Sequence, residues 1–240
     1  MSKQKLNKTA DKLNKLDLNP EFKRALELME NSDKNIFVTG RAGTGKSTLL
    51  EYFRYHTKKK IVVLAPTGVA AVNVRGQTIH SFFRFKPDIS LNKIKKKGDD
   101  KDSIYKKLDA IVIDEVSMVR ADLLDCVDKF MRLNGRDRRR PFGGTQMIFI
   151  GDLYQLPPVV TSRDKMAFAN NYNSPYFFSA MVFTDNGLLH EGFKMEMIEL
   201  EKIYRQKDQG FIDLLNMVRN NSVTANELAA LNARHDSGFF

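Results

Sequence analysis

The sequence predicts an α/β fold in which a mainly parallel sheet is covered by helices. Four short apolar runs, each bounded by turn signals, recur along the 240 residues and are separated by helical patterns. Runs without polar alternation are typical of strands that are buried on both faces, as in a parallel sheet between helices. Ligands of such sheets bind beyond the carboxyl ends of the strands, so the residues that follow each run are the candidates for function.

The elements are expected in a repeated strand-helix order. The strands are predicted at residues 35–39, 61–65, 110–114 and 146–150, with helices at 48–55 and 121–133. Residues 84–107 interrupt this order because they are rich in lysine and poor in apolar side chains, which predicts a small basic insertion on the surface. Residues 136–144 form a basic loop before the fourth strand, either solvated or in contact with phosphate.

Composition and charge narrow the class of protein. With 42% hydrophobic and 28% charged residues, the chain has a globular composition and is unlike disordered, collagenous or disulfide-rich proteins. The net charge is 39 − 29 = +10, which favours a polyanionic partner such as nucleic acid. The single cysteine, Cys126, lies on the apolar side of a predicted helix and allows no disulfide within the chain. No apolar stretch is long enough to cross a bilayer, so we expect a soluble intracellular protein.

A phosphate-binding loop follows the first strand. Residues 40–47 read Gly-Arg-Ala-Gly-Thr-Gly-Lys-Ser, which fits G-x-x-x-x-G-K-[ST] between a predicted strand and a predicted helix. Glycines let backbone N–H groups approach phosphate, and the helix N-terminus adds partial positive charge. Lys46 is expected to reach the β- and γ-phosphates and Ser47 to bind Mg²⁺. The candidate nucleotide-binding residues of the loop are Gly43, Thr44, Gly45, Lys46, Ser47 and Thr48.

Two carboxylates follow the third strand. A P-loop enzyme needs one carboxylate for the magnesium ion and one beside the attacking water, and Asp114 and Glu115 are placed to take these roles in that order. After the fourth strand, Gln155 is a candidate to hydrogen-bond the γ-phosphate or its water.

The second strand is followed by candidates for nucleic-acid binding. Pro66 and Thr67 end this strand, and His80 and Ser81 lie downstream beside Phe82 and Phe83. Small polar groups with aromatic rings suit single-stranded nucleic acid, whose bases stack on rings. The alternative is that the two phenylalanines are core residues and the histidine is structural.

Taken together, these segments resemble the PIF family of superfamily 1B DNA helicases, which are relatives of RecD-type enzymes. The similar segments are residues 40–47 (motif I), 65–71 (motif Ia), 78–83, 114–118 (motif II), 151–159 (motif III) and 200–206 with 211–219 (motif IV and the family's signature region).

The resemblance implies a RecA-like P-loop NTPase domain that uses ATP with Mg²⁺ to move 5′ to 3′ on single-stranded DNA and to unwind forked duplex DNA in genome maintenance. It implies a DNA-binding role for Pro66, Thr67, His80, Ser81, Pro158 and Val159. It also implies that Arg205 approaches the γ-phosphate. The expected organisation is an arm and lead-in helix (1–34), a first motor domain (35–190) that carries the insertion, and an incomplete start of a second RecA-like domain (191–240).

The chain departs from the family pattern at two places. Phe22 stands where the family has a glutamine that reads adenine, and the preceding Asn19 and Pro20 suit either a nucleotide contact or the N-cap and first residue of a helix. The chain also stops at Phe240, before motifs V and VI, so we expect nucleotide binding and weak DNA binding with little unwinding. The alternatives are another P-loop NTPase, such as a nucleotide kinase or a clamp-loader-like ATPase, and a non-catalytic DNA-binding module.

Overall fold

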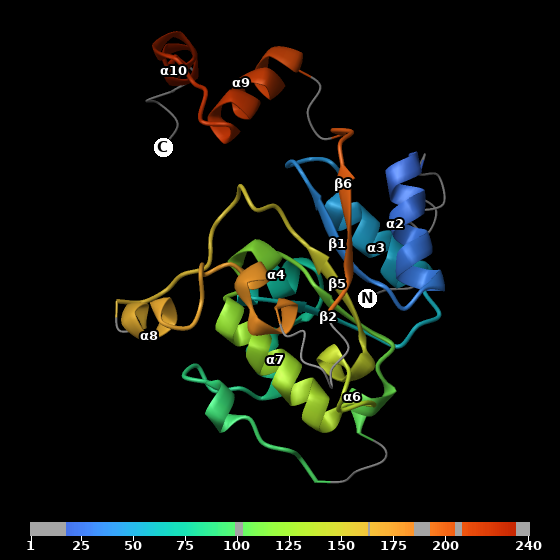
Figure 1. Cartoon of the computed structure of the whole chain (residues 1–240). Coiled ribbons are helices and arrows are strands. Elements are labelled where there is room, and N and C mark those ends of the chain that lie inside the picture. Colours follow the sequence, from blue (N-terminus) through green and yellow to red (C-terminus); the bar gives the residue numbers. More distant parts are fainter. Residues whose placement is uncertain (1–17, 99–102, 163, 185–192, 205–207, 234–240) are drawn as a thin grey trace.

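A six-stranded parallel sheet forms the centre of the molecule (Figure 1). The computed structural model describes residues 18–98, 103–162, 164–184, 193–204 and 208–233. The strands lie in the order β3-β2-β4-β5-β1-β6, and every pair of neighbours is parallel. Their bounds are β1 Asn35–Gly40, β2 Ile61–Ala65, β3 Gln77–Thr78, β4 Ala110–Ile113, β5 Gln146–Ile150 and β6 Met195–Leu200.

The four strands predicted from apolar runs are confirmed as the interior of this sheet. All residues of β4 and β5 are buried, as expected for strands with helices on both faces. The sequence did not reveal β3 and β6. Strand β3 has only two residues, and β6 reads Met-Glu-Met-Ile-Glu-Leu, whose polar side chains suit the edge of a sheet and break the apolar run.

Helices cover both faces of the sheet. Their bounds are α2 Pro20–Asn31, α3 Lys46–His56, α4 Gly68–Asn73, α5 Ile79–Phe83, α6 Ile104–Lys107, α7 Ala121–Asn134, α8 Lys165–Ala169, α9 Gln209–Arg219 and α10 Ala225–Asn232. The two predicted helices therefore correspond to α3 and α7. Short 3-10 helices occur at residues 91–93, 116–118, 141–144, 177–179 and 181–183.

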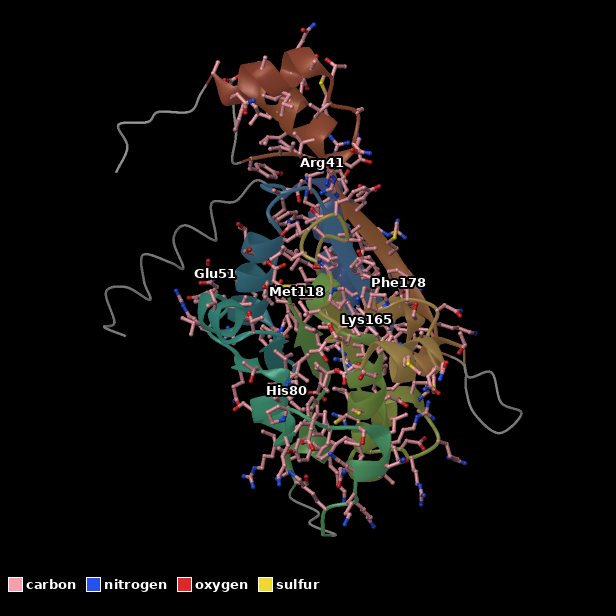
Figure 2. All side chains as sticks on the ribbon, turned by 90° about the vertical axis from the view of Figure 1, so that its left-hand side faces the viewer. Arg41, Glu51, His80, Met118, Lys165 and Phe178 are labelled. Carbon is pink, nitrogen blue, oxygen red and sulfur yellow. The ribbon has the colours of Figure 1, made fainter. Side chains whose placement is uncertain are left out.

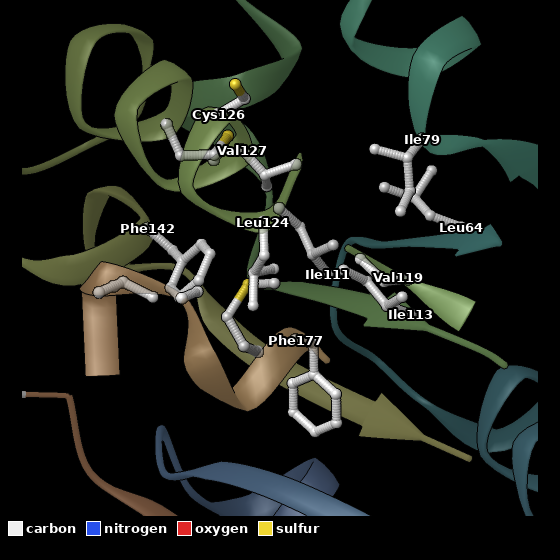
Figure 3. Packing of buried hydrophobic residues seen from close by; sticks show 14 of the residues in the cluster. Leu64, Ile79, Ile111, Ile113, Val119, Leu124, Cys126, Val127, Phe142 and Phe177 are labelled. Carbon is white, nitrogen blue, oxygen red and sulfur yellow. The ribbon is translucent and has the colours of Figure 1, made fainter. Parts of the chain in front are cut away.

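Alternate residues of the central strands divide the core into two clusters. Ile36, Val112 and Ile148 pack with α2 and α3 on one face of the sheet. Ile111 and Phe149 belong to the cluster on the other face, which includes the apolar side of α7. Figure 3 shows this second cluster, in which Leu124, Cys126 and Val127 of α7 lie over β4. The prediction that the cysteine is buried is confirmed, since its side chain is 1% exposed.

The expected surface insertion at residues 84–107 is more closely tied to the core than its lysines indicate. Ile94 and Tyr105 are each 7% exposed and belong to the α7 cluster. The Tyr105 ring lies 4.8 Å from that of Phe130, and the Lys97 N–H donates to Asn134 Oδ1 at 2.7 Å. A few apolar side chains therefore hold the described part of this segment against α7, and the prediction that it lies outside the core was wrong in this respect.

The sheet extends beyond the predicted end of the first domain at residue 190. Strand β6 pairs with β1 along its full length, from Asn35 opposite Met195 to Gly40 opposite Leu200. Helices α9 and α10 follow and lie past the carboxyl end of β1 and β6 (Figure 1). Within the described residues, no helix is both long and apolar enough to span a membrane.

Candidate nucleotide-binding site

The phosphate loop connects β1 to α3 through backbone that favours glycine. Gly40 has φ +147° and Gly45, the N-cap of α3, has φ +93°. A Cβ on Gly40 would lie 2.5 Å from the carbonyl oxygen of Leu200, so the loop approaches β6 more closely than a side chain permits. No side chain caps α3. The N–H groups of its first turn are thus oriented as a phosphate-binding helix N-terminus requires.

Lys46 and Ser47 are the first two residues of α3. The Lys46 ammonium donates to the carbonyl oxygens of Gly40 at 2.6 Å and Arg41 at 3.1 Å. Burial lowers the pKa of Lys46, and the nearby carboxylates of Asp152 and Glu115 oppose this effect. The lysine therefore lies within the electrostatic field of the acidic groups at the ends of the neighbouring strands.

Asp114 and Glu115 stand at the carboxyl end of β4. Burial, and secondarily the charge of Glu115, raises the pKa of Asp114 to about 6. Glu115 adopts φ +51°, a left-handed conformation that is strained for a residue with a side chain. Asp114, Glu115 and Ser47 line one cavity of about 510 Å³ between α3 and α4. Strained backbone beside a buried carboxylate is typical of a functional site.

A second cleft, of about 650 Å³, contains the phosphate loop. It is lined by the loop itself, by Glu115, by Asp152, Tyr154 and Gln155 after β5, and by one side of α9. Arg41 of the loop lies near the end of the molecule that carries α9 and α10, whereas His80 lies much lower in the view (Figure 2). The strand ends thus bring Lys46, Ser47 and Glu115 together at one rim of the sheet, as the motifs require.

Asp152 and Arg219 join this cleft without having been singled out from the sequence. The Asp152 carboxylate is 1% exposed and accepts from Arg219 Nη1 at 2.5 Å, from the Tyr154 N–H at 3.1 Å and from Gln155 Nε2 at 3.2 Å. The Arg219 guanidinium also lies 4.2 Å from the centre of the Tyr154 ring. Both residues lie in segments that resemble family motifs, residues 151–159 and 211–219, but neither was assigned a role from the sequence.

Comparison with known proteins identifies the family. A family model described as PIF1-like helicase matches residues 17–228. The chain belongs to the PIF1-like helicase family. It is 38% identical over 221 residues to the ATP-dependent DNA helicase PIF1 of Saccharomyces cerevisiae, covering 84% of this chain and 23% of the yeast protein. It is 32% identical to the ATP-dependent DNA helicase Pif1 of Bdellovibrio bacteriovorus, covering 88% of this chain and 45% of that protein.

Solved structures of PIF1-like helicases share this fold. The Bacteroides Pif1 helicase in complex with ADP-AlF3 and single-stranded DNA has a TM-score of 0.80 and 35% identity, over 92% of this chain and 51% of that one. A structure concerning forked DNA unwinding by two Pif1 helicases gives a TM-score of 0.79 and 36% identity, over 90% of this chain and 51% of that one. This PIF1-like chain therefore spans about half or less of the proteins that it matches.

Several DNA-binding candidates of this PIF1-like chain lie at the starts of α4 and α5. Thr67 and Thr78 cap α4 and α5 by accepting from the Ala70 and Ser81 N–H groups, at 3.2 and 3.1 Å. Strands β2 and β3 are neighbours, so Pro66 and Thr67 lie near the segment that carries His80 and Ser81. Burial lowers the pKa of His80, which keeps its ring neutral at physiological pH.

Other candidates of this region differ in their exposure. Phe82 and Phe83 are core residues, 9% and 1% exposed, which confirms the structural interpretation of these rings. Val159 is 73% exposed, whereas Pro158 is buried.

Asn19 and Pro20 form the start of α2, which is one of the two interpretations of these residues; the other was a nucleotide contact. Asn19 is the N-cap, with its Oδ1 accepting from the Phe22 N–H at 2.8 Å, and Pro20 is the first helical residue. Phe22 is buried under the phosphate loop, where a Cβ on Gly45 would come within 3.0 Å of its ring. The predicted γ-phosphate arginine, Arg205, lies outside the described residues.

Proposed function

We propose that this chain is the first motor domain of an ATP-dependent DNA helicase that couples ATP hydrolysis to 5′-to-3′ movement on single-stranded DNA and unwinding of forked duplex. The observation that supports this most is the meeting of the phosphate loop with the carboxylates of Asp114 and Glu115 at one rim of the sheet. Membership of the PIF1-like helicase family supports the same function. The setting would be the nucleoid or nucleus, and the process DNA repair, recombination or telomere maintenance.

The donor set at this rim fits Mg²⁺ and a nucleoside triphosphate. Mg²⁺ is usually bound by one or two carboxylates together with waters and substrate phosphates, so a dedicated cage of protein ligands is not needed. The described residues contain no group of three or more His, Cys, Asp or Glu side chains that could hold a metal ion, while Ser47 and Asp114 line one cavity. These two residues would hold the ion, which would neutralise charge on the β- and γ-phosphates.

The protein side chains supply positioning and charge. Gly43, Thr44, Gly45, Lys46 and Thr48 would surround the phosphates with N–H groups and one ammonium. Glu115 would orient the attacking water and accept its proton. Gln155, which lies in the cleft, would contact the γ-phosphate or its water, and Arg205 would add positive charge there.

The partners that we propose are single-stranded and forked duplex DNA. Pro66, Thr67, His80, Ser81 and Val159 would contact the strand, with Pro158 shaping the loop before Val159. A second RecA-like domain would complete the ATP site, since helicase motors close two lobes around the nucleotide. We therefore expect this chain to bind nucleotide and weakly bind DNA, with little unwinding of its own.

Binding of a fluorescent ATP analogue with and without Mg²⁺ tests the nucleotide site. Lys46→Ala removes the ammonium from the phosphate loop and should weaken binding at least about tenfold, because hydrogen bonds to charged groups are worth about 1.5–3 kcal/mol. Lys58→Ala is the matched control, because Lys58 lies just past the other end of α3 and lines neither cavity at the rim. Equal affinity of the Lys46→Ala variant and the unmodified chain would contradict the assignment.

Hydrolysis separates the proposed motor from its rivals. In a protein that contains both lobes, single-stranded DNA should stimulate hydrolysis, whereas a nucleotide kinase or a clamp-loader-like ATPase would not respond to it in this way. Glu115→Gln should remove turnover but retain ATP binding. Hydrolysis that is insensitive to this change would remove the reason to prefer an enzyme over a non-catalytic DNA-binding module.

A further inference from the structure

A buried carboxylate links the end of β5 to α9. Asp152 is 1% exposed, and a buried charge is tolerated only where it is paired and hydrogen-bonded. Its Oδ2 accepts from both Arg219 Nη1 and Gln155 Nε2, so one oxygen holds two side chains that face the cleft. The residue therefore fixes the candidate γ-phosphate sensor and the end of α9 at the same time.

Arg219 ends α9, with its side chain 17% exposed. Its guanidinium reaches 67 positions back along the chain to Asp152 and lies 4.2 Å from the centre of the Tyr154 ring. A guanidinium that stacks on an aromatic ring still directs its N–H groups outward in its own plane, where they can bind an anion. The contact thus binds α9 to the sheet through a group that is also suited to phosphate.

This ion pair lies within electrostatic reach of the phosphate loop. The Asp152 carboxylate raises the pKa of Lys46, and the Arg219 charge lowers it. Both residues line the cleft that contains the loop. A triphosphate on Lys46 would bring further negative charge close to the guanidinium, and arginine binds phosphate and carboxylate by the same paired N–H geometry.

We propose that Arg219 is a positioning residue for which Asp152 and the terminal phosphate of ATP compete, so that α9 takes different positions with triphosphate and with diphosphate. The proposal rests on the proposed function, because it requires nucleotide at the phosphate loop. By this movement, α9 transmits whether ATP or ADP is bound to the part of the chain that follows it.

Affinity measurements on this chain with fluorescent ATP and ADP analogues test the competition. Arg219→Gln should weaken ATP binding about tenfold while leaving ADP binding nearly unchanged, because only the triphosphate reaches the guanidinium. Asp152→Asn has the same shape without the charge and should strengthen ATP binding, since it releases Arg219. The double variant should lose that gain. Arg138→Gln removes an exposed arginine that lines neither cavity at the rim, and should behave as the unmodified chain.

A distance measurement tests the movement of α9. Spin labels at Lys23→Cys on α2 and Ser222→Cys after α9 can be attached selectively, because Cys126 is 1% exposed. The label separation should differ between Mg·ATPγS and Mg·ADP in the otherwise unmodified chain, should not differ in Arg219→Gln, and should differ partly in Arg219→Lys.

The outcomes separate this inference from the proposed function. If the unmodified chain binds neither nucleotide, the proposed function fails and the inference fails with it. If both nucleotides bind but α9 does not move, or if Arg219→Gln moves it as before, only the inference is overturned. A purely structural ion pair would make Asp152→Asn and Arg219→Gln weaken ATP binding alike, and that result would also overturn it.

Discussion

The phosphate loop begins at a residue that has no room for a side chain. Gly40 combines φ +147° with a position where a Cβ would lie 2.5 Å from the Leu200 carbonyl and 2.8 Å from Thr44 Oγ1. Gly40 is also the last residue of β1 that pairs with β6, opposite Leu200, and the phosphate loop starts there. Gly40 therefore belongs both to the β1–β6 edge of the sheet and to the phosphate loop.

We predict that Gly40→Ala lowers the free energy of unfolding by about 1–3 kcal/mol, the usual cost of a strained backbone conformation. Chemical denaturation measures this change. Gly98→Ala is the matched control, because a Cβ on Gly98 meets nothing within 4 Å, and its effect should be small. Equal stability of the Gly40→Ala variant and the unmodified chain would contradict the close contact with β6.

The thiol of Cys126 gives a second prediction at this scale. Burial raises the pKa of this thiol to about 12, and the side chain is 1% exposed. Because the thiolate is the reactive form, Cys126 should not react with a thiol reagent in the folded protein at pH 8 but should react at once in denaturant. Rapid labelling of the native chain would show that α7 does not pack as described.

At the scale of elements, apolar runs and helical periodicity predicted the interior strands and two of the helices. Strands β4 and β5 are continuous apolar runs because both of their faces are covered, and α3 and α7 have helical periodicity. Strand β6 was missed because Glu196 and Glu199 interrupt its apolar residues, so that only the pairing with β1 identifies it. The segment with the lysines was misjudged because its few apolar side chains, among them the buried Ile94 and Tyr105, pack against the cluster of α7.

The start of α2 allows a test of two roles for one residue. Asn19→Ala should cost about 1 kcal/mol of stability because the cap of the helix is lost, and Asn19→Ser should retain most of it. Denaturation measures the cap, and binding of the ATP analogue measures any nucleotide contact. If Asn19→Ser keeps its stability but binds ATP more weakly, the residue contacts the nucleotide as well; unchanged binding in both variants would leave the helix cap as its role.

At the scale of the whole molecule, the net charge of +10 should govern the interaction with DNA. We predict that the affinity for single-stranded DNA falls steeply with salt, with log K changing by about −0.7 per neutralised phosphate for each unit of log salt concentration. Fluorescence anisotropy with a labelled oligonucleotide over a range of salt concentrations measures this slope. A flat response would show that the basic surface is not the path of the DNA.

The sequence by itself determined the interior strands, the phosphate loop and the two carboxylates after β4, because each is encoded by residues that are neighbours in the chain. Only the tertiary structure decided that β6 closes one edge of the sheet, that Gly40 must be glycine for contact with Leu200, and that Asp152 holds Arg219 across 67 positions. Such pairings bring distant segments together, and their energies come from packing and burial that no local pattern contains.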